Sequence, residues 1–214
     1  MPESYDPKYV ESGWYPWWEK KKFFHSETKN ALAVREESKE DKKQFTIIIP
    51  PPNITGALHL GHALMLSIED TIVRWKRMKG YECCWLPGQD HAGISTQTVV
   101  ENMLWRDKRQ TRHDLGRDKF VETAMEWKEV YGGKINHQFK KMGISVDWDR
   151  FVFTMDEKRC RAVEEAFIQM FNRGIIYRAS RLVNWCSALQ TALSDLEVEY
   201  KDLEKPTDLS IPNH

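Results

Sequence analysis

The sequence has few cysteines and no long apolar run, and each of these absences excludes a class of protein. Its four cysteines form no Cys-x-x-Cys pair, so neither a zinc ribbon nor a disulfide framework is expected, and the thiols should stay reduced. No apolar stretch approaches the roughly 18 residues that cross a membrane. The N-terminus has neither an apolar signal segment nor an arginine-rich presequence. We therefore expect a cytoplasmic protein without a membrane partner.

The chain also lacks an excess of either charge. Lysine and arginine number 32, as do aspartate and glutamate, so the net charge is zero and gives no argument for nucleic-acid binding. Hydrophobic residues make up 41% and charged residues 30% of the chain. This composition is typical of a folded globular protein and not of a disordered one.

Apolar patterning predicts a strand, a helix and a second strand in the first half of the chain. Residues 45–49 form a β-branched run stopped by three prolines, as expected of a buried central strand. Residues 58–79 have helical periodicity, and 82–86 predict the second strand, which together make a βαβ unit. The apolar face of the helix is expected to consist of Leu60, Ala63, Leu64, Ile68, Ile72, Trp75 and Met78.

Other elements are expected on both sides of this unit. The many aromatics within 5–30 predict an N-terminal helical arm packed on the main domain, followed by a charged, solvated linker at 35–43. Two helices are expected at 95–105 and 117–142, the second with a core-facing apolar stripe. A third should run from a capping box of Thr154 and Glu157 to Gly174. Short strands are expected at 175–178, 182–185 and 196–200.

The most informative segment runs from Pro50 to His62 and reads PPPNITGALHLGH. It lies between a strand end and a helix start, where open α/β sheets bind ligands and free backbone N–H groups favour phosphate. His59 and His62 share one helix face, so both imidazoles can face one anion, and Gly61 leaves room for a base or ribose. The pattern favours phosphoryl chemistry with an ATP-like ligand. Two alternatives remain open, a metal-binding pair without an obvious third ligand and histidines satisfied within the protein.

Residues 59–62 match the HxGH signature of class I aminoacyl-tRNA synthetases, and the surrounding residues resemble the valyl-tRNA synthetase family within that class. The proline triplet with Asn53, Thr55 and Gly56 is similar to that family, and so is the block PGQDHAGISTQ at 87–97. The resemblance extends over about residues 5–203. Further matching segments are 127–133, 147–148, 153–156 and 182–199.

The resemblance implies an α/β fold that contains the first half of a Rossmann-like class I synthetase catalytic domain. Residues 1–44 would be the N-terminal helical arm and linker, and 45–180 the half-domain. Residues 181–214 would be strands that start the connection to an editing domain.

The resemblance also implies the reaction, which attaches valine to its cognate tRNA through a valyl-adenylate. The expected partners are valine, ATP with Mg²⁺, and valine tRNA. His59 and His62 would be the catalytic pair that holds the triphosphate. The ATP-binding residues would be Asn53, Thr55, Gly56, His59, Gly61 and His62, and the valine-binding residues Pro51, Asn53 and Asp90. A helix cap is the alternative role for Asp90.

Complete enzymes of this family are several times longer than the chain, so we expect a fragment that binds ATP without efficient catalysis. The sequence contains no KMSKS loop, and the similar stretch at 141–145 is interpreted as a helix end. An exposed half-sheet should make the chain associate. Two other functions stay open, a truncated nucleotide- or tRNA-binding module and a small HxGH nucleotidylyltransferase, against which the proline triplet argues.

A local basic excess is the remaining candidate for a tRNA contact. Between Arg106 and Lys141, ten lysines and arginines stand against six acidic residues. These cations could contact phosphates of the tRNA acceptor stem. A solvated helix face is the commoner origin of such a stretch.

Overall fold

The computed structural model describes residues 4–26 and 43–202, and the chain divides into two compact units, residues 1–164 and 165–214. The linker expected at 35–43 lies outside the described residues except for its last position. Within the described ranges, no helix has both the length and the apolar composition needed to cross a membrane. The domain boundaries expected from the sequence, after residues 44 and 180, stay predictions.

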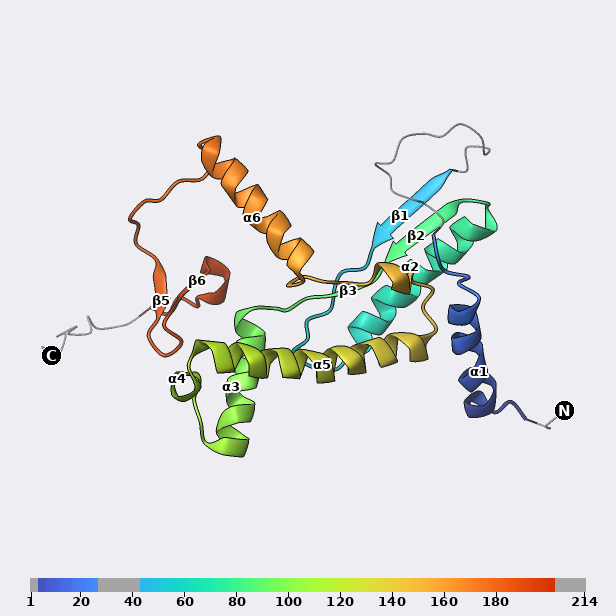
Figure 1. The fold of residues 1–214 in the computed structure, drawn as a ribbon, viewed down its shortest axis with the longest axis horizontal. Helices are drawn as coiled ribbons and strands as arrows, with labels where there is room; N and C mark the ends of the chain where they lie inside the picture. The colour runs from blue at the N-terminus through green and yellow to red at the C-terminus, as the bar shows by residue number, and fades with distance from the viewer. Residues whose placement is uncertain (1–3, 27–42, 203–214) are drawn as a thin grey trace, which may run out of the picture. The chain divides into compact units, whose positions relative to one another are not determined.

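The first unit contains the predicted βαβ segment, which is confirmed. Strand β1 (Gln44–Ile48) leads through helix α2 (Leu60–Met78) to strand β2 (Glu82–Leu86) (Figure 1). The two strands are parallel, in a register that runs from Gln44 opposite Glu82 to Ile48 opposite Leu86. Three prolines after β1 remove backbone donors and end the strand, as expected.

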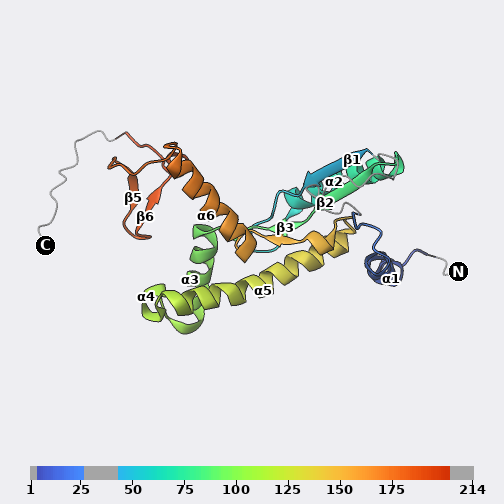
Figure 2. The ribbon, with the colours of Figure 1, turned by 45° about the horizontal axis from the view of Figure 1, so that its top comes forward.

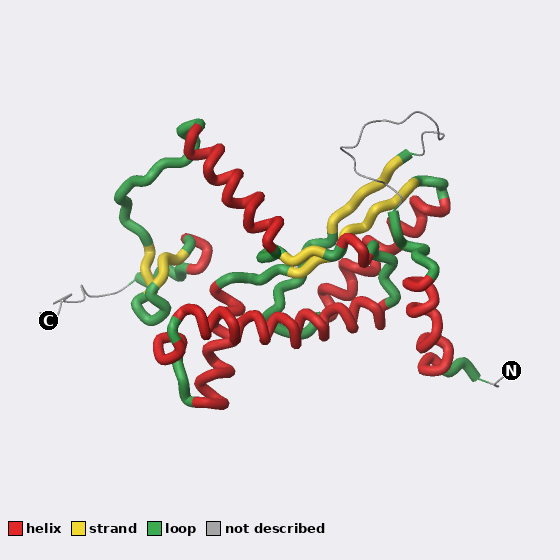
Figure 3. The backbone as a smooth tube through the Cα atoms, in the orientation of Figure 1, coloured by secondary structure: helices red, strands yellow, loops and turns green. Residues whose placement is uncertain are grey.

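A second parallel pair extends this arrangement toward the candidate site. Strands β3 (Gly88–Gln89) and β4 (Val152–Phe153) pair in parallel, and an isolated parallel bridge joins Asn53 to Asp90. Figure 3 shows these short strands in yellow where the chain leaves β1 and β2. The segments after β1 and β2 therefore remain side by side beyond the sheet itself.

Three helices follow β3, namely α3 (Ile94–Lys108), α4 (Arg112–Leu115) and α5 (Arg117–Met142). Figures 1 and 2 show α5 running from α3 and α4 at its start to helix α1 near its end. The bounds of α5 are those predicted. Gly143 caps it in the left-handed conformation (φ +72°), which confirms the interpretation of 141–145 as a helix end.

The core of the first unit lies where α2, β2 and α5 meet the loop after α5. Its buried side chains are Ile49, Ile54, Leu66, Val73, Cys83, Trp85, Ile135, Phe139, Ile144, Val146 and Phe153. The stripe predicted on α5 is therefore confirmed in its C-terminal half, by Ile135 and Phe139.

All four cysteines are free thiols, and burial raises the pKa of Cys83 and Cys84.

Two predictions about burial are wrong. Strand β1 is not a buried central strand, because among the described residues it pairs only with β2, and Ile48 is 70% exposed. On α2 the packed face contains Leu66 and Val73, whereas the predicted apolar face is largely open to solvent, with Leu60 84% exposed. The helix has two apolar faces, and the periodicity alone could not tell which one packs.

The N-terminal helical arm is confirmed as helix α1 (Pro7–Lys20), which belongs to the first unit and contacts the segment after α5. The Tyr15 hydroxyl donates to the carbonyl oxygen of Ile144 (2.8 Å) and accepts from the indole N–H of Trp148 (2.7 Å). The arm's aromatics are packed only in part, since the side chains of Trp14 and Phe23 are about half exposed.

Helix α6 (Glu157–Asn172) begins in the first unit and continues into the second. Its cap is Asp156, whose carboxylate accepts the N–H of Arg159, so the predicted Thr154 capping box is wrong. None of its residues is buried, since an apolar period makes a helix amphipathic but does not supply a covering element.

The second unit continues with an antiparallel pair, β5 (Asn184–Cys186) and β6 (Thr191–Leu193), and a short 3₁₀ turn, η2 (Asp195–Glu197). The strand predicted at 182–185 is present as β5, which begins two residues and ends one residue later than predicted and pairs with β6. The strands predicted at 175–178 and 196–200 are absent from this described part of the chain. The second of these positions is occupied in part by η2, whose turn is closed by Ser194 and Glu197.

Candidate active site

The site forms in the loop between β1 and α2. Side chains of α5 hydrogen-bond to the backbone of this loop. The side-chain oxygen of Gln138 accepts the backbone N–H of Leu58 (2.9 Å), and the indole N–H of Trp127 donates to the carbonyl of Ile54 (2.8 Å). Ile54 itself is buried, with 2% of its surface exposed. The loop therefore approaches α2 in a conformation fixed at two points by a long, packed helix.

His59 and His62 lie together at the start of α2, as the sequence predicted. His59 is the N-cap residue, and its Nδ1 accepts the N–H of Gly61 (3.1 Å), while Nδ1 of His62 accepts the N–H of His59 (3.2 Å). The ring centroids are 3.9 Å apart, at an interplanar angle of 41°. This reciprocal capping satisfies two of the backbone donors that a helix start leaves free.

The capping bonds also decide which ring nitrogens carry hydrogen. Because each Nδ1 accepts a backbone N–H, the neutral imidazoles of His59 and His62 must carry their hydrogen on Nε2. Both Nε2–H groups are then donors at the positive end of the α2 dipole. Two directed donors beside a helix N-terminus form an arrangement suited to a phosphate group.

Gly61 is needed for this geometry in a way the sequence did not reveal. A Cβ atom at this position would lie 2.9 Å from Cε1 of His59. The space left by the missing Gly61 side chain is therefore occupied by the capping imidazole of His59. Whether it also leaves room for a base or ribose stays a prediction.

Burial lowers the pKa of His62, and the neighbouring His59 lowers it further by charge repulsion. The neutral form of His62, which the capping bond requires, is thereby favoured. Protonation at Nδ1 would replace the acceptor of the His59 N–H with a donor.

A pocket of about 420 Å³ lies over the start of α2 and is formed mostly by residues that the sequence predicted. Its lining residues are Pro50, Pro51, Pro52, Asn53, Thr55, Gly56, Ala57, His59, His62 and Met65. The predicted residues Gly61 and Asp90 are not part of this lining. Among these described lining residues there is no carboxylate that could hold a metal ion.

Asp90 lies beside the proline loop through backbone pairing. Its N–H donates to the carbonyl of Pro52 (2.9 Å), and its carbonyl accepts the N–H of Ile54 (3.0 Å). This is the bridge that places Asp90 opposite Asn53. Within the described part of the chain no group donates to the carbonyl of Pro51, which stays available to a ligand.

The alternative role of Asp90 as a helix cap is excluded, because the N-cap of α3 is Gly93 and makes no side-chain bond. Instead, Oδ1 of Asp90 accepts the N–H of Ala92 (3.0 Å) and the hydroxyl of Thr154 (3.1 Å). The side chain is 37% exposed. Among the described residues none hydrogen-bonds its Oδ2, so one carboxylate oxygen is fixed and the other remains an acceptor.

Gln89, directly before Asp90, anchors this segment to α5. The side chain is buried, and its amide donates to the carbonyl of Gly132 (2.9 Å) and to the side chain of Asn136 (2.7 Å). A Cβ at position 132 would lie 2.6 Å from the Gln89 side-chain oxygen, so a side chain there would displace the Gln89 amide. Gln89, Trp127, Gln138 and Thr154 were not predicted as site residues, because their partners lie 43 to 80 positions away in sequence.

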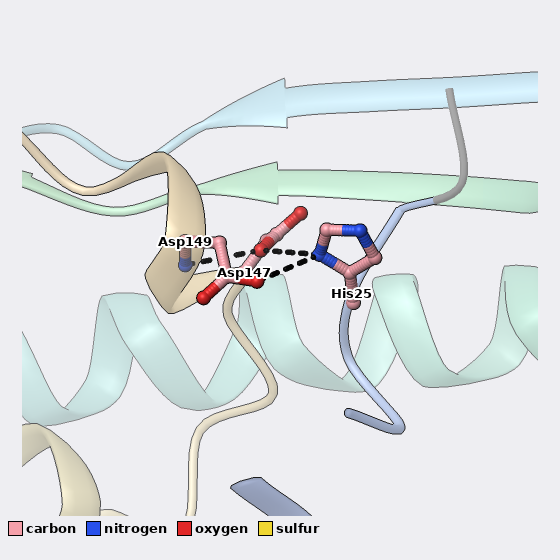
Figure 4. Close-up of side chains that lie close together, drawn as sticks. All are labelled: His25, Asp147 and Asp149. Atoms are coloured by element: carbon pink, nitrogen blue, oxygen red, sulfur yellow. Dashed lines mark hydrogen bonds and ion pairs between the residues drawn. The ribbon is translucent and has the colours of Figure 1, made fainter. Parts of the chain in front are cut away.

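A second cluster has the composition of a metal site but acts as an ion-pair cluster. Ligand atoms of His25, Asp147 and Asp149 lie within 4.8 Å of one another (Figure 4). Lys22 binds the Asp149 carboxylate (2.9 Å), and Arg150 binds that of buried Asp147 (3.1 Å). Cations already neutralise both carboxylates, and the ion pairs connect the end of the N-terminal arm to the η1 turn (Trp148–Arg150).

Comparison with known proteins gives matches over nearly the whole chain. Residues 13–210 match the family model of tRNA synthetases class I (I, L, M and V). The chain is 51% identical to a valine–tRNA ligase of Homo sapiens, over all of the chain and 17% of that protein. It is also 51% identical to a valine–tRNA ligase of Schizosaccharomyces pombe, over 99% of the chain and 21% of that protein. The chain thus spans about a fifth of the length of these relatives.

Among solved structures, one match is the LeuRS–tRNA–LeuAMS ternary complex of Agrobacterium radiobacter K84 agnB2. The TM-score is 0.71 at 20% sequence identity, and the match covers 92% of this chain and 22% of that one. At this identity the likeness concerns the fold, and it agrees with the α/β arrangement predicted from the sequence.

Proposed function

Because the chain belongs to the class I tRNA synthetases of the isoleucine, leucine, methionine and valine group, we propose that it carries the ATP- and valine-binding part of an enzyme that joins valine to its tRNA. The first step is in-line attack of the valine carboxylate on the α-phosphate of ATP, which yields valyl-adenylate and pyrophosphate. For this reaction the protein's task is to position both reactants and stabilise the charge at phosphorus.

The paired Nε2–H donors of His59 and His62 carry this proposal. They lie over a pocket at the α2 N-terminus, and their hydrogen bonds to the triphosphate strengthen as negative charge moves toward the departing pyrophosphate. Asn53, Thr55 and Gly56 line the same pocket and shape it around ATP. Mg²⁺ would neutralise phosphate charge and be held by the phosphates themselves, since the lining offers no carboxylate.

Valine binds beside this pocket, with its ammonium group between Oδ2 of Asp90 and the carbonyl of Pro51. Both oxygens lack a donor among the described residues, and the backbone bridge to Asn53 keeps them on adjacent segments. A carboxylate and a carbonyl are the acceptors that an ammonium group requires. The identity of about 50% to proteins named valine–tRNA ligase supports valine over the other three amino acids of the group.

Contact with tRNA through the basic stretch 106–141 is also part of the proposal, although several of its cations are already paired. Arg112 pairs with Glu101, and Lys140 with Glu19. A cytoplasmic location likewise stays a prediction, since the relatives include ligases of Arabidopsis thaliana and Homo sapiens that are named mitochondrial.

Valine-dependent pyrophosphate exchange tests this function. The chain replaces the matching segment of the Schizosaccharomyces pombe relative, and His59→Ala and His62→Ala are compared with His137→Ala, an exposed histidine of α5. Loss of one transition-state donor should lower kcat about 100-fold with little change in KM for valine, and His137→Ala should be unaffected. Unchanged kcat in both site variants contradicts the proposal. Binding of ATP without exchange by the unsubstituted hybrid would favour the non-catalytic module.

A further inference from the structure

We propose that Thr154 is a positioning residue for the amino-acid substrate: its hydroxyl holds one oxygen of Asp90 so that the other accepts the substrate ammonium. This inference rests on the proposed function, because it assigns Asp90 to the ammonium of valine. Thr154 does not line the pocket over α2 and is not expected to touch ATP.

The position of Thr154 follows from the β3–β4 pairing. Gln89 lies opposite Phe153 in the parallel register, and the N–H of Thr154 donates to the carbonyl of Gln89 (3.2 Å). The residue after β4 is therefore brought against the residue after β3, which is Asp90. The cap of α6 is Asp156, so the hydroxyl of Thr154 is not used to begin that helix.

The hydrogen-bond pattern then assigns the hydroxyl hydrogen to Asp90. The Thr154 oxygen accepts the backbone N–H of His91 (2.9 Å) and lies 2.6 Å from Nδ1 of the same residue. A hydroxyl has a single hydrogen, and a carboxylate oxygen can only accept. If Nδ1 of His91 donates to Thr154, the hydroxyl hydrogen is available to Oδ1 of Asp90, 3.1 Å away, and each of these hydrogens has an acceptor.

The consequence for Asp90 is a carboxylate with two distinct oxygens. Oδ1 receives the N–H of Ala92 and the hydroxyl of Thr154, which together fix the rotation of the carboxylate plane. Oδ2 has no partner among the described residues, and the fixed rotation of the carboxylate plane sets its direction. Without the Thr154 hydroxyl, Oδ1 would keep the N–H of Ala92 and the longer contact with Nδ1 of His91, 3.3 Å away, and the carboxylate could rotate. This rotation weakens a charge-assisted bond that depends on geometry.

The test uses Thr154→Val, which keeps the shape and removes the hydroxyl, and Thr154→Ser, which keeps the hydroxyl. Both are made in the hybrid enzyme described above, and Thr123→Val is the matched control, because that hydroxyl donates to the Lys119 carbonyl within α5. We expect Thr154→Val to raise KM for valine about three- to tenfold, the equivalent of one hydrogen bond, with KM for ATP unchanged. Thr154→Ser should restore KM for valine, and Thr123→Val should have no effect.

Two competitive inhibitors separate positioning of Asp90 from a general structural effect. Valinol retains the ammonium group of valine, whereas isovalerate lacks it. The inhibition constant of valinol should rise with KM for valine in Thr154→Val, while that of isovalerate stays constant. An equal change for both compounds, a parallel change in KM for ATP, or failure of Thr154→Ser to restore valine binding overturns the proposal. Failure of the proposed function is distinguishable, because the unsubstituted hybrid would then show no valine-dependent exchange.

Discussion

Gln138 on α5 accepts the backbone N–H of Leu58, 2.9 Å away, directly before the helix that carries both histidines. The two residues are 80 positions apart in sequence. Through this bond the longest helix of the described structure fixes the direction in which the loop enters α2. The geometry of the histidine pair therefore depends on a residue outside the HxGH motif.

Replacement of Gln138 by leucine should loosen this loop. The Leu58 N–H would lose its acceptor, at a cost of about 1–3 kcal/mol in the free energy of unfolding, and ATP affinity should fall several-fold. Gln138→Glu keeps an acceptor oxygen and should retain both properties. Chemical denaturation and calorimetry measure them, and ATP binding that is equally strong in the leucine variant would show that the loop conformation does not depend on α5.

Gly61→Ala should separate ATP binding from stability. The new Cβ would lie 2.9 Å from Cε1 of His59 and displace the imidazole, so ATP affinity should fall about tenfold through loss of one charge-assisted bond. The higher helix propensity of alanine, about 1 kcal/mol, should offset the lost cap. Gly133→Ala is the control, because a Cβ there meets nothing within 4 Å. Undiminished ATP affinity in Gly61→Ala would contradict the assigned position of His59.

The lowered pKa of His62 predicts a pH dependence of stability. Below the unfolded pKa of about 6.5 the unfolded chain binds a proton at this residue that the folded chain still excludes. Stability should therefore fall as the pH drops from that value to the lower folded pKa, and this contribution should not change further below it. Denaturation of the protein and of His62→Gln across pH 5–8 measures the difference. An identical pH dependence in both proteins would show that the folded pKa is not lowered.

The exposed apolar face of α2 should make the isolated chain associate. Leu64 and Ile68 are 63% and 54% exposed on successive turns of that face. Ile68→Lys should reduce concentration-dependent association in sedimentation experiments with little loss of stability. Leu66→Lys, at a fully buried position of the same helix, should unfold the protein. A chain that is monomeric at all concentrations would contradict this expectation.

Local elements could be predicted from the sequence because their signals are local. The bounds of α5 follow from its apolar period and Gly143, and the βαβ unit follows from two short apolar runs around a helical pattern. The histidine pair could be predicted for the same reason, since both residues lie within one helical turn. The tautomers of these histidines required the structure, because the capping bonds of Nδ1 depend on ring orientation.

Long-range relationships could not be predicted from one sequence. Thr154 has the spacing of a capping residue for α6, but β4 brings it to Asp90, where the hydroxyl finds a different partner. Likewise, the apolar period of α2 marks a face suited to burial without indicating whether anything packs there. Both errors arise where tertiary contacts override a local signal.

The proposed function depends on binding of the ATP phosphates by the Nε2–H groups of His59 and His62. The most direct measurement is ¹⁵N NMR of the imidazole nitrogens in the chain, with and without ATP and Mg²⁺. This binding mode predicts hydrogen on Nε2 and a bare Nδ1 in both rings at neutral pH, with ATP shifting the two Nε2–H signals and leaving the signals of His137 unchanged. Hydrogen on Nδ1 in either ring, or Nε2–H signals that ATP does not move, would contradict it.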